Sequence, residues 1–240
     1  MLENASTPKS AALHRGPGFR IRRDFPRPKP EVIDALASYP CPDISDILNR
    51  LYTMKPELKN LTSDKKICGP ACTVKVYPGD NLMVHQALDI AKSGDIVVVD
   101  AGESAMNGIV GDLISTKAKF RGIQGFVIDG LIRDLSDIQA LDFPVYARGV
   151  TPVGPLHRGP GEINFSISCG GIVVNPGDVI CGDENGLVVV RQEFAEELVS
   201  RLEEQKNSSA EYEENVKKGV FSNAWVNNAL DSAGCVYVDE

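Results

Sequence analysis

Two kinds of hydrophobic pattern alternate along the central part of the chain. Nearly continuous apolar runs, such as DIVVVDAG (95–102) and GFVIDG (125–130), are separated by stretches whose apolar residues recur every three to four positions. The continuous runs are typical of strands in a sheet that is covered on both faces. The periodic stretches predict amphipathic helices. This alternation predicts repeated βαβ units and a mainly parallel or mixed sheet.

The same pattern predicts where the helices and strands lie. Helices are expected at 29–40, 41–51, 81–94, 111–122 and 136–141. Strands are expected at 69–79, 95–102, 125–130 and 144–149. Downstream, GGIVVNPGDVICGDENGLVVV is typical of strands joined by turns, with a hairpin at Asp183–Gly186.

The two ends of the chain differ from this central domain, which is expected to span residues 29–191. Residues 1–28 are rich in Gly, Pro and Arg and lack periodicity, so we interpret them as an N-terminal arm. The stretch from Gln192 to Lys218 predicts one helix, near 40 Å long at about 1.5 Å per residue. Because its second half is mostly polar, we expect residues 192–240 to form a helix and tail that pack on a neighbouring subunit.

Composition excludes several classes of function. The 240 residues suit one large domain with appendages, and the net charge of −8 with no long basic run argues against nucleic-acid binding. The sequence contains no run of 18 apolar residues, so no membrane span is expected. The N-terminus lacks an apolar segment of signal-peptide length, so a cytoplasmic location is expected.

The cysteines do not form a recognisable metal motif. Cys68 and Cys72 are four residues apart, but no second Cys/His pair completes a zinc site, and the three histidines are scattered. We interpret all six cysteines as small buried or half-buried hydrophobic residues. They are Cys41, Cys68, Cys72, Cys169, Cys181 and Cys235.

Candidate chemistry gathers where two of the predicted strands end. GDLI (111–114) follows the VVVDAG strand and opens a helix, whose free amides and partial positive charge favour an anion. The next strand ends on Arg133 and Asp134. In a parallel sheet both features lie at the same edge, where ligands collect. Arginine binds carboxylates or oxyanions with a planar fork, and aspartate binds hard cations such as Mg²⁺. The alternative is a surface salt bridge at a strand end.

The stretch VGDLISTKAKFRGIQGFVIDGLIRDLSDI, with the downstream GGIVVNPGDVICGDENGLVVV, resembles the RraA-like family. This family includes class II 4-hydroxy-4-methyl-2-oxoglutarate / 4-carboxy-4-hydroxy-2-oxoadipate aldolases. The resemblance covers roughly residues 30–220. It implies an α/β fold of the swivelling β/β/α type, with a mixed sheet, flanking helices and a long C-terminal helix. It also implies a homotrimer or homohexamer.

The resemblance assigns roles to particular residues. It places the metal on Asp134 and the substrate arginine at Arg133. A glutamate from the C-terminal helix of a neighbouring subunit approaches the metal's waters, and we choose Glu211 among several acidic residues. The substrate-binding backbone falls on Gly111, Asp112, Leu113 and Ile114.

The reaction that the resemblance implies is a metal-dependent retro-aldol cleavage of a 4-hydroxy-2-oxo acid to pyruvate and a second oxo acid. The cofactor is Mg²⁺ or another divalent cation such as Mn²⁺. The expected base is a metal-linked water, relayed by Asp112 or Glu211, which takes the C4 hydroxyl proton. Arg133 with the metal stabilises the pyruvate enolate. Decarboxylation of oxaloacetate passes through the same enolate and is expected as a side activity.

Several alternatives compete with this interpretation. The namesake members of the family are non-catalytic regulators that inhibit an RNA-degrading enzyme, but those chains are shorter and lack the long C-terminal helix. An older label for such chains is menaquinone methyltransferase. The sequence shows no Gly-rich cofactor loop, so this function is discounted. Another alternative is a lyase that acts on a different 2-oxo acid, because the motif recognises only the pyruvoyl end of the substrate. Lys117 and Lys119 lie on a helix where nothing activates them for a Schiff base, and we expect His85 to serve packing.

Overall fold

The computed structural model describes residues 18–238 of the chain. The chain divides into two compact units, residues 1–199 and 200–240, and each is described by itself. No helix in the described part is long and apolar enough to span a membrane.

The first unit is built on a mixed sheet, as the sequence predicts. Four strands run parallel and are neighbours in chain order. They are β3 (Ile67–Val76), β4 (Ile96–Gly108), β5 (Gly125–Ile132) and β6 (Val145–Val150). Beyond β3 the sheet continues through antiparallel β7 (Gly161–Ile163) to β1 (Phe19–Ile21), and beyond β6 it ends on antiparallel β2 (Lys59–Asn60).

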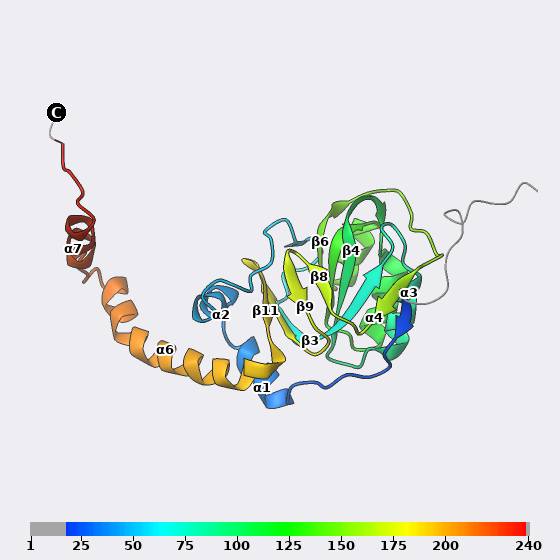
Figure 1. Ribbon diagram of the computed structural model, residues 1–240, viewed down its shortest axis with the longest axis horizontal. Coiled ribbons are helices and arrows are strands. Elements are labelled where there is room, and N and C mark those ends of the chain that lie inside the picture. Colours follow the sequence, from blue (N-terminus) through cyan, green and yellow to red (C-terminus); the bar gives the residue numbers. More distant parts are fainter. Residues whose placement is uncertain (1–17, 239–240) are drawn as a thin grey trace, which may run out of the picture. The chain divides into compact units, whose positions relative to one another are not determined.

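Helices connect the successive parallel strands, which confirms the predicted βαβ units. They are α3 (Leu82–Ile90), α4 (Asp112–Phe120) and α5 (Leu135–Leu141). Figure 1 shows α3 and α4 together along one side of the sheet, where α3 packs on β3 and α4 packs on both other helices. Val97 and Val99 of β4 belong to the hydrophobic core on this side.

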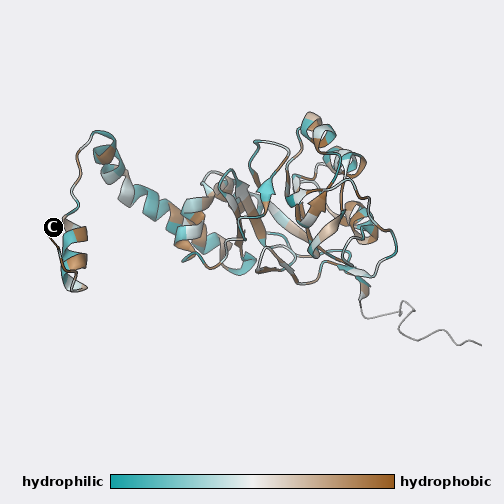
Figure 2. Cartoon of the chain, turned by 90° about the horizontal axis from the view of Figure 1, so that it is seen from above, coloured by the Kyte–Doolittle hydropathy of each residue, from teal (hydrophilic) through white to brown (hydrophobic). Residues whose placement is uncertain are grey.

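A second layer covers the other face. It contains the antiparallel pair β10 (Val179–Asp183) and β11 (Gly186–Val190), and the pair β8 (Ile167–Cys169) and β9 (Ile172–Val174). Ile96 and Val98 point into this second core, whereas Val97 and Val99 point into the first. Successive side chains of a strand face opposite ways, so a strand buried on both faces has to be apolar throughout. Figure 2 colours the inner strands mostly as hydrophobic.

Other predicted elements are also present. The first two helices are α1 (Pro30–Ala37) and α2 (Cys41–Ile47). The hairpin at Asp183–Gly186 joins β10 to β11, and Asp183 stabilises it by accepting a hydrogen bond from the Asn185 amide at 2.8 Å. Five of the cysteines are buried as expected, but Cys235 is exposed, which corrects the prediction for that residue.

The described part of the N-terminal arm, residues 18–28, contains contacts that the sequence pattern does not reveal. β1 pairs in parallel with β7. Arg27 donates two hydrogen bonds to the buried carboxylate of Asp95, at 2.8 and 2.7 Å. Residues 1–17 of the predicted arm lie outside the described part of the chain.

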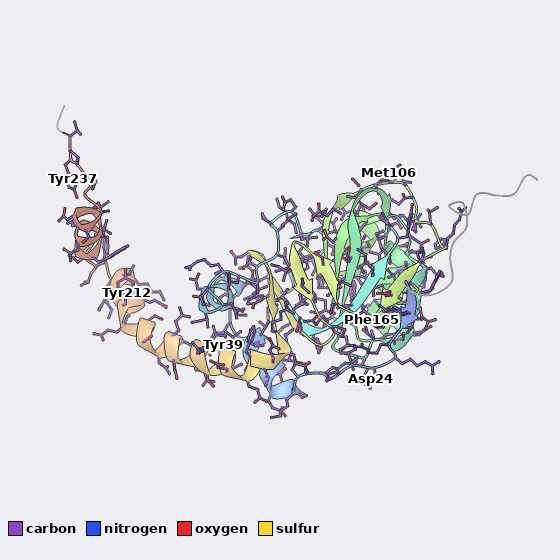
Figure 3. The ribbon with its side chains drawn as sticks, in the orientation of Figure 1. Asp24, Tyr39, Met106, Phe165, Tyr212 and Tyr237 are labelled. Carbon is purple, nitrogen blue, oxygen red and sulfur yellow. The ribbon has the colours of Figure 1, made fainter. Side chains whose placement is uncertain are left out.

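The long C-terminal helix is present as predicted. A short 3-10 turn, η2 (Gln192–Phe194), leads into α6 (Ala195–Lys217). Leu198 and Leu202 of its first half are buried, whereas Tyr212, labelled in Figure 3, is 62% exposed. A further helix, α7 (Ala224–Ser232), was not predicted.

We predict that Arg27→Ala lowers the free energy of unfolding by about 2–3 kcal/mol, because it leaves the Asp95 carboxylate buried without its cation. Lys29→Ala is the matched control. It removes an ion pair to Glu196 in which both side chains are mostly exposed, so no measurable change is expected. Urea unfolding of both variants checks this. Equal stabilities would show that the contact between Arg27 and Asp95 does not stabilise the domain.

Candidate functional site

The site begins where β4 and β5 end side by side. Beyond the regular pairing, the Ile109 amide donates to the Leu131 carbonyl at 2.8 Å, and the Arg133 amide donates to the Val110 carbonyl at 3.0 Å. These two bonds hold the start of α4 against the end of β5. The structure thus brings the GDLI stretch and the Arg133–Asp134 pair together, as the parallel arrangement predicts.

Gly111 lies so close to both residues that a larger side chain would displace the end of the Asp134 side chain. A Cβ atom at this position would lie 2.3 Å from Asp134 Oδ2 and 3.2 Å from Arg133 Cγ. Gly111 is in an extended conformation and precedes α4. Its carbonyl accepts hydrogen bonds from the Ser115 amide at 3.1 Å and the Ser115 hydroxyl at 2.9 Å. Because Gly111 has no side chain, the Asp134 carboxylate and the Arg133 side chain approach its backbone closely, and we call this position the Gly111 space.

The first turn of α4, which begins beside Gly111, has free amide groups. The helix's first backbone bond is that of Ser115, so the preceding N–H groups have no acceptor within the helix. Ile114 is buried and fixes the turn, Asp112 is half-buried, and the Leu113 side chain is 68% exposed. Free amides and the helix dipole favour a bound carboxylate or phosphate.

Arg133 and Asp134 form an ion pair at the rim of this space. Arg133 Nε lies 3.1 Å from Asp134 Oδ2, and both side chains are partly exposed. Asp134 has a left-handed backbone, with φ 55° and ψ 41°, at the start of α5. This conformation is uncommon for residues other than glycine. A pair this exposed contributes little to stability. The unusual backbone of Asp134 and its closeness to Gly111 therefore favour a binding role over a plain surface salt bridge.

A loop from Thr151 to Arg158 adds residues that the sequence did not indicate. Asn107, beside Met106 at the outer end of β4 (Figure 3), donates to the Gly154 carbonyl at 2.6 Å. Arg133 Nη1 lies 2.9 Å from where a Gly154 Cβ would be. The loop thus borders the guanidinium of the proposed site.

Two histidines lie at the other end of that loop. Buried Asn81 donates to the Ile109 carbonyl at 2.9 Å, and its oxygen lies 2.7 Å from His157 Nδ1. Since that oxygen can only accept, the proton of His157 resides on Nδ1. The ring of His85 is 5.9 Å from that of His157. Burial, with the charge of Lys117 and the neighbouring His157, lowers the pKa of His85. No periodicity in the loop sequence could have indicated this pair.

Other predicted site residues are placed as follows. Glu211 lies on α6 in the second unit and is exposed, so its approach to a neighbouring Asp134 stays a prediction. Lys117 and Lys119 are exposed on α4, and Lys119 donates to the Leu141 carbonyl. A cavity of about 670 Å³ lies at the amino ends of the parallel strands, beside Lys59, Tyr146 and Asp183, and contains none of the predicted site residues.

The donor set at this site fits a hydrated Mg²⁺ ion. Within residues 18–238, no three His, Cys, Asp or Glu side chains lie close enough to hold a metal between them. Mg²⁺ keeps several waters and commonly uses one or two carboxylates with oxygens of the substrate. Asp134, partly exposed and facing the Gly111 space, offers a carboxylate of this kind.

Comparison with known protein families shows which family the chain belongs to. Residues 41–189 match the model of the RraA-like family, described as Aldolase/RraA. The chain belongs to the RraA-like family. A Halalkalibacterium halodurans protein named "Putative 4-hydroxy-4-methyl-2-oxoglutarate aldolase" is 36% identical over 80% of this chain and 91% of its own length. A protein of the same name from Hahella chejuensis is 34% identical over 63% of this chain and 92% of its own.

Solved structures of RraA proteins have the same fold. Streptomyces coelicolor RraAS2, described as an unusual member of the RNase ES inhibitor RraA protein family, matches with a TM-score of 0.73 and 26% identity. The match covers 79% of this chain and 99% of that one. An uncharacterised protein from Pseudomonas syringae matches with a TM-score of 0.72 and 24% identity over 82% of this chain and 97% of its own. The RraA-like fold is therefore a mixed sheet with flanking helices, here followed by a long C-terminal helix.

We predict that Gly111→Ala weakens ligand binding much more than it weakens folding. The new methyl group meets the end of the Asp134 side chain, which can rotate away without displacing the backbone. Mn²⁺ affinity, measured by titration calorimetry, should fall at least about tenfold, or about 1.4 kcal/mol, because the Asp134 carboxylate is displaced. The melting temperature should change little. Unchanged Mn²⁺ affinity would show that the Asp134 carboxylate, in its position beside Gly111, does not hold the ion.

Proposed function

We propose that the chain is a divalent-metal-dependent aldolase. It cleaves a 4-hydroxy-2-oxo acid, such as 4-hydroxy-4-methyl-2-oxoglutarate, into pyruvate and a second oxo acid. The observation that carries this proposal is the convergence of the Gly111 amide space, Arg133 and Asp134 at one strand edge. The family match and the names of the relatives support the aldolase class.

The pyruvoyl end of the substrate fits the polar groups of this edge. Its carboxylate accepts hydrogen bonds from the backbone amides of residues 111–114 at the start of α4, where the helix dipole adds attraction. The guanidinium of Arg133 donates to the C2 oxygen. A divalent ion held by Asp134 would supply additional positive charge next to the same oxygen.

Cleavage requires a base for the C4 hydroxyl group. The half-buried Asp112, on the first turn of α4, or Glu211 of a neighbouring subunit would relay this proton through a water. As the O–H electrons form the new carbonyl, the C3–C4 bond breaks and its electrons become the enolate of pyruvate. Arg133 stabilises the negative oxygen, which is the charge that develops in the transition state. Protonation at C3 then gives pyruvate.

The same positions explain why oxaloacetate is expected as a second substrate. Loss of CO₂ from its C4 leaves the electron pair on C3, which forms the same enolate. No base is needed for this reaction, so it depends on Arg133 but not on Asp112. A Schiff-base route has less support, because Lys117 and Lys119 are both exposed on α4.

A second candidate function is regulation of an RNA-degrading enzyme. The likeness to Streptomyces coelicolor RraAS2 favours it, since that protein is described as belonging to an RNase inhibitor family. The close approach of Asp134 and Arg133 to Gly111 is not needed for a surface that docks another protein, so it favours the aldolase. Inhibition of an RNase that persists in Arg133→Ala, without any lyase activity in the wild type, would favour the regulator.

The direct test of the proposal is pyruvate release from a panel of 4-hydroxy-2-oxo acids and oxaloacetate, measured with and without Mg²⁺. EDTA should abolish the activity, and added Mg²⁺ should restore it. Borohydride with pyruvate should trap no enzyme, because no lysine forms an imine. Full turnover in EDTA, or a trapped lysine adduct, would contradict the metal-dependent mechanism.

Arg133→Lys should lower kcat strongly although the charge is retained, because an ammonium group cannot reproduce the planar fork. The expected loss is roughly 2 to 4 kcal/mol of transition-state stabilisation, the range for removing one oxyanion donor. Steady-state kinetics with the best substrate of the panel measures it. A change confined to KM would mean that Arg133 only binds the ground state.

Glu211→Ala should be nearly inactive if the helix of one subunit completes the site of another in a homotrimer or homohexamer. Arg133→Ala should also be inactive alone. Refolding the two variants together should restore part of the activity, because some interfaces then pair an intact Arg133 with an intact Glu211.

Verified mixed oligomers that stay inactive would argue against a shared site. A fully active Glu211→Ala variant would instead redirect the search along α6, with Glu213 and Glu214 as the next residues to substitute.

A further inference from the structure

Two cysteines outside the proposed site face each other across a pair of strands. Cys68 of β3 and Cys181 of β10 are directly opposite in the antiparallel register, and their Sγ atoms are 3.6 Å apart. Directly opposed residues in such pairs have Cα atoms about 4.5 or 5.5 Å apart. Disulfides form at Cα separations of roughly 4.4–6.8 Å. The register therefore places the two Cα atoms within the range that a disulfide requires, and the two thiols are already close together.

A small cavity adjoins this pair. It has a volume of about 140 Å³ and is lined by both thiols, by Cys41 and by side chains of α1. Of the five buried cysteines, Cys68 keeps the largest exposed fraction, 7%, against 3% for Cys181. The Cys68 thiol also donates a hydrogen bond to the Ile33 carbonyl of α1, at 3.4 Å. Cys68 is thus the more exposed member of the pair that lines the cavity.

The groups around the three thiols affect the pKa values of Cys181 and Cys41. Contact with Cys68, together with burial, raises the pKa of the Cys181 thiol, so Cys181 stays protonated. Burial and the Asp183 carboxylate raise the pKa of the Cys41 thiol, which makes it a weak competitor. Asp183 itself accepts hydrogen bonds from the amides of Cys41 and Asn185.

We propose that Cys68 and Cys181 are an oxidation site that hydroperoxides convert into a disulfide. The Cys68 sulfur attacks the terminal peroxide oxygen, the O–O bond breaks, and Cys68 becomes a sulfenic acid while the alcohol or water leaves. Cys181 then attacks that sulfur. The S–S bond forms, the S–O bond breaks, and water leaves with the Cys181 proton. Two thiols lose two electrons and two protons, and the hydroperoxide is reduced.

The disulfide would join β3 to β10 and close a long loop. The two residues are 113 positions apart, and the intervening chain contains the central parallel strands. Long loops are those in which a crosslink restricts the unfolded chain most. Neither cysteine contacts Gly111, Arg133 or Asp134 in the described residues. Oxidation should therefore raise the thermal stability and leave the activity of the proposed site unchanged.

The test treats the full chain with hydrogen peroxide and then maps its peptides without reduction. The expected product is a Cys68–Cys181 crosslink with a mass lower by two hydrogen atoms, and a melting temperature higher by at least about 5 °C. Both changes should be absent in Cys181→Ser and present in the matched control Cys235→Ser, which removes the exposed cysteine of the tail. In Cys181→Ser, a carbon nucleophile such as dimedone should capture the Cys68 sulfenic acid.

Two results would overturn the proposal. One is a Cys41–Cys68 bond in place of the expected crosslink. The other is a chain in which Cys68 stays reduced while Cys235 is oxidised. The expected crosslink without any rise in melting temperature would confirm the oxidation site and overturn only the inferred stabilisation. The melting temperatures of the reduced variants show whether each substitution itself perturbs folding.

Discussion

The backbone junction between the ends of β4 and β5 is the interaction on which the proposed site depends. The bonds from Ile109 to Leu131 and from Arg133 to Val110 fix the start of α4 beside the end of β5. Because the two strands are parallel, helix amides and the guanidinium arrive at the same edge. A register change of one residue would reverse which face Arg133 occupies and would separate it from Gly111.

The main elements of this fold could be predicted because burial on both faces leaves a clear mark in the sequence. Ile96 to Val99 pack alternately into the two cores, which requires the unbroken apolar run. What could not be predicted has no such mark. β4 continues to Gly108 through a polar stretch in which Gly102 and Glu103 have positive φ, and β1 has only three residues. The extension of β4 and the short β1 each form by pairing with a strand elsewhere in the sequence.

The candidate site was predictable to a similar extent. Gly111, Arg133 and Asp134 could be placed together because a motif and a parallel sheet determine where they lie. The contact between Asn81 and His157 could not, since it joins a helix start to an irregular loop 76 positions away. Glu211 remains a prediction because its proposed partner belongs to another subunit. The cysteine pair was also missed, since only strand register shows that Cys68 and Cys181 are opposite.

The central claim is that Gly111, Arg133 and Asp134 bind one pyruvoyl group with its metal. The most direct measurement is a crystal structure with Mg²⁺ and oxalate, which has the planar shape and charge of the pyruvate enolate. The account predicts a carboxylate of oxalate on the amides at the start of α4, Mg²⁺ on Asp134 and an oxygen against the Arg133 guanidinium. Oxalate and Mg²⁺ bound elsewhere, with the ion pair of Arg133 and Asp134 unchanged, would contradict it.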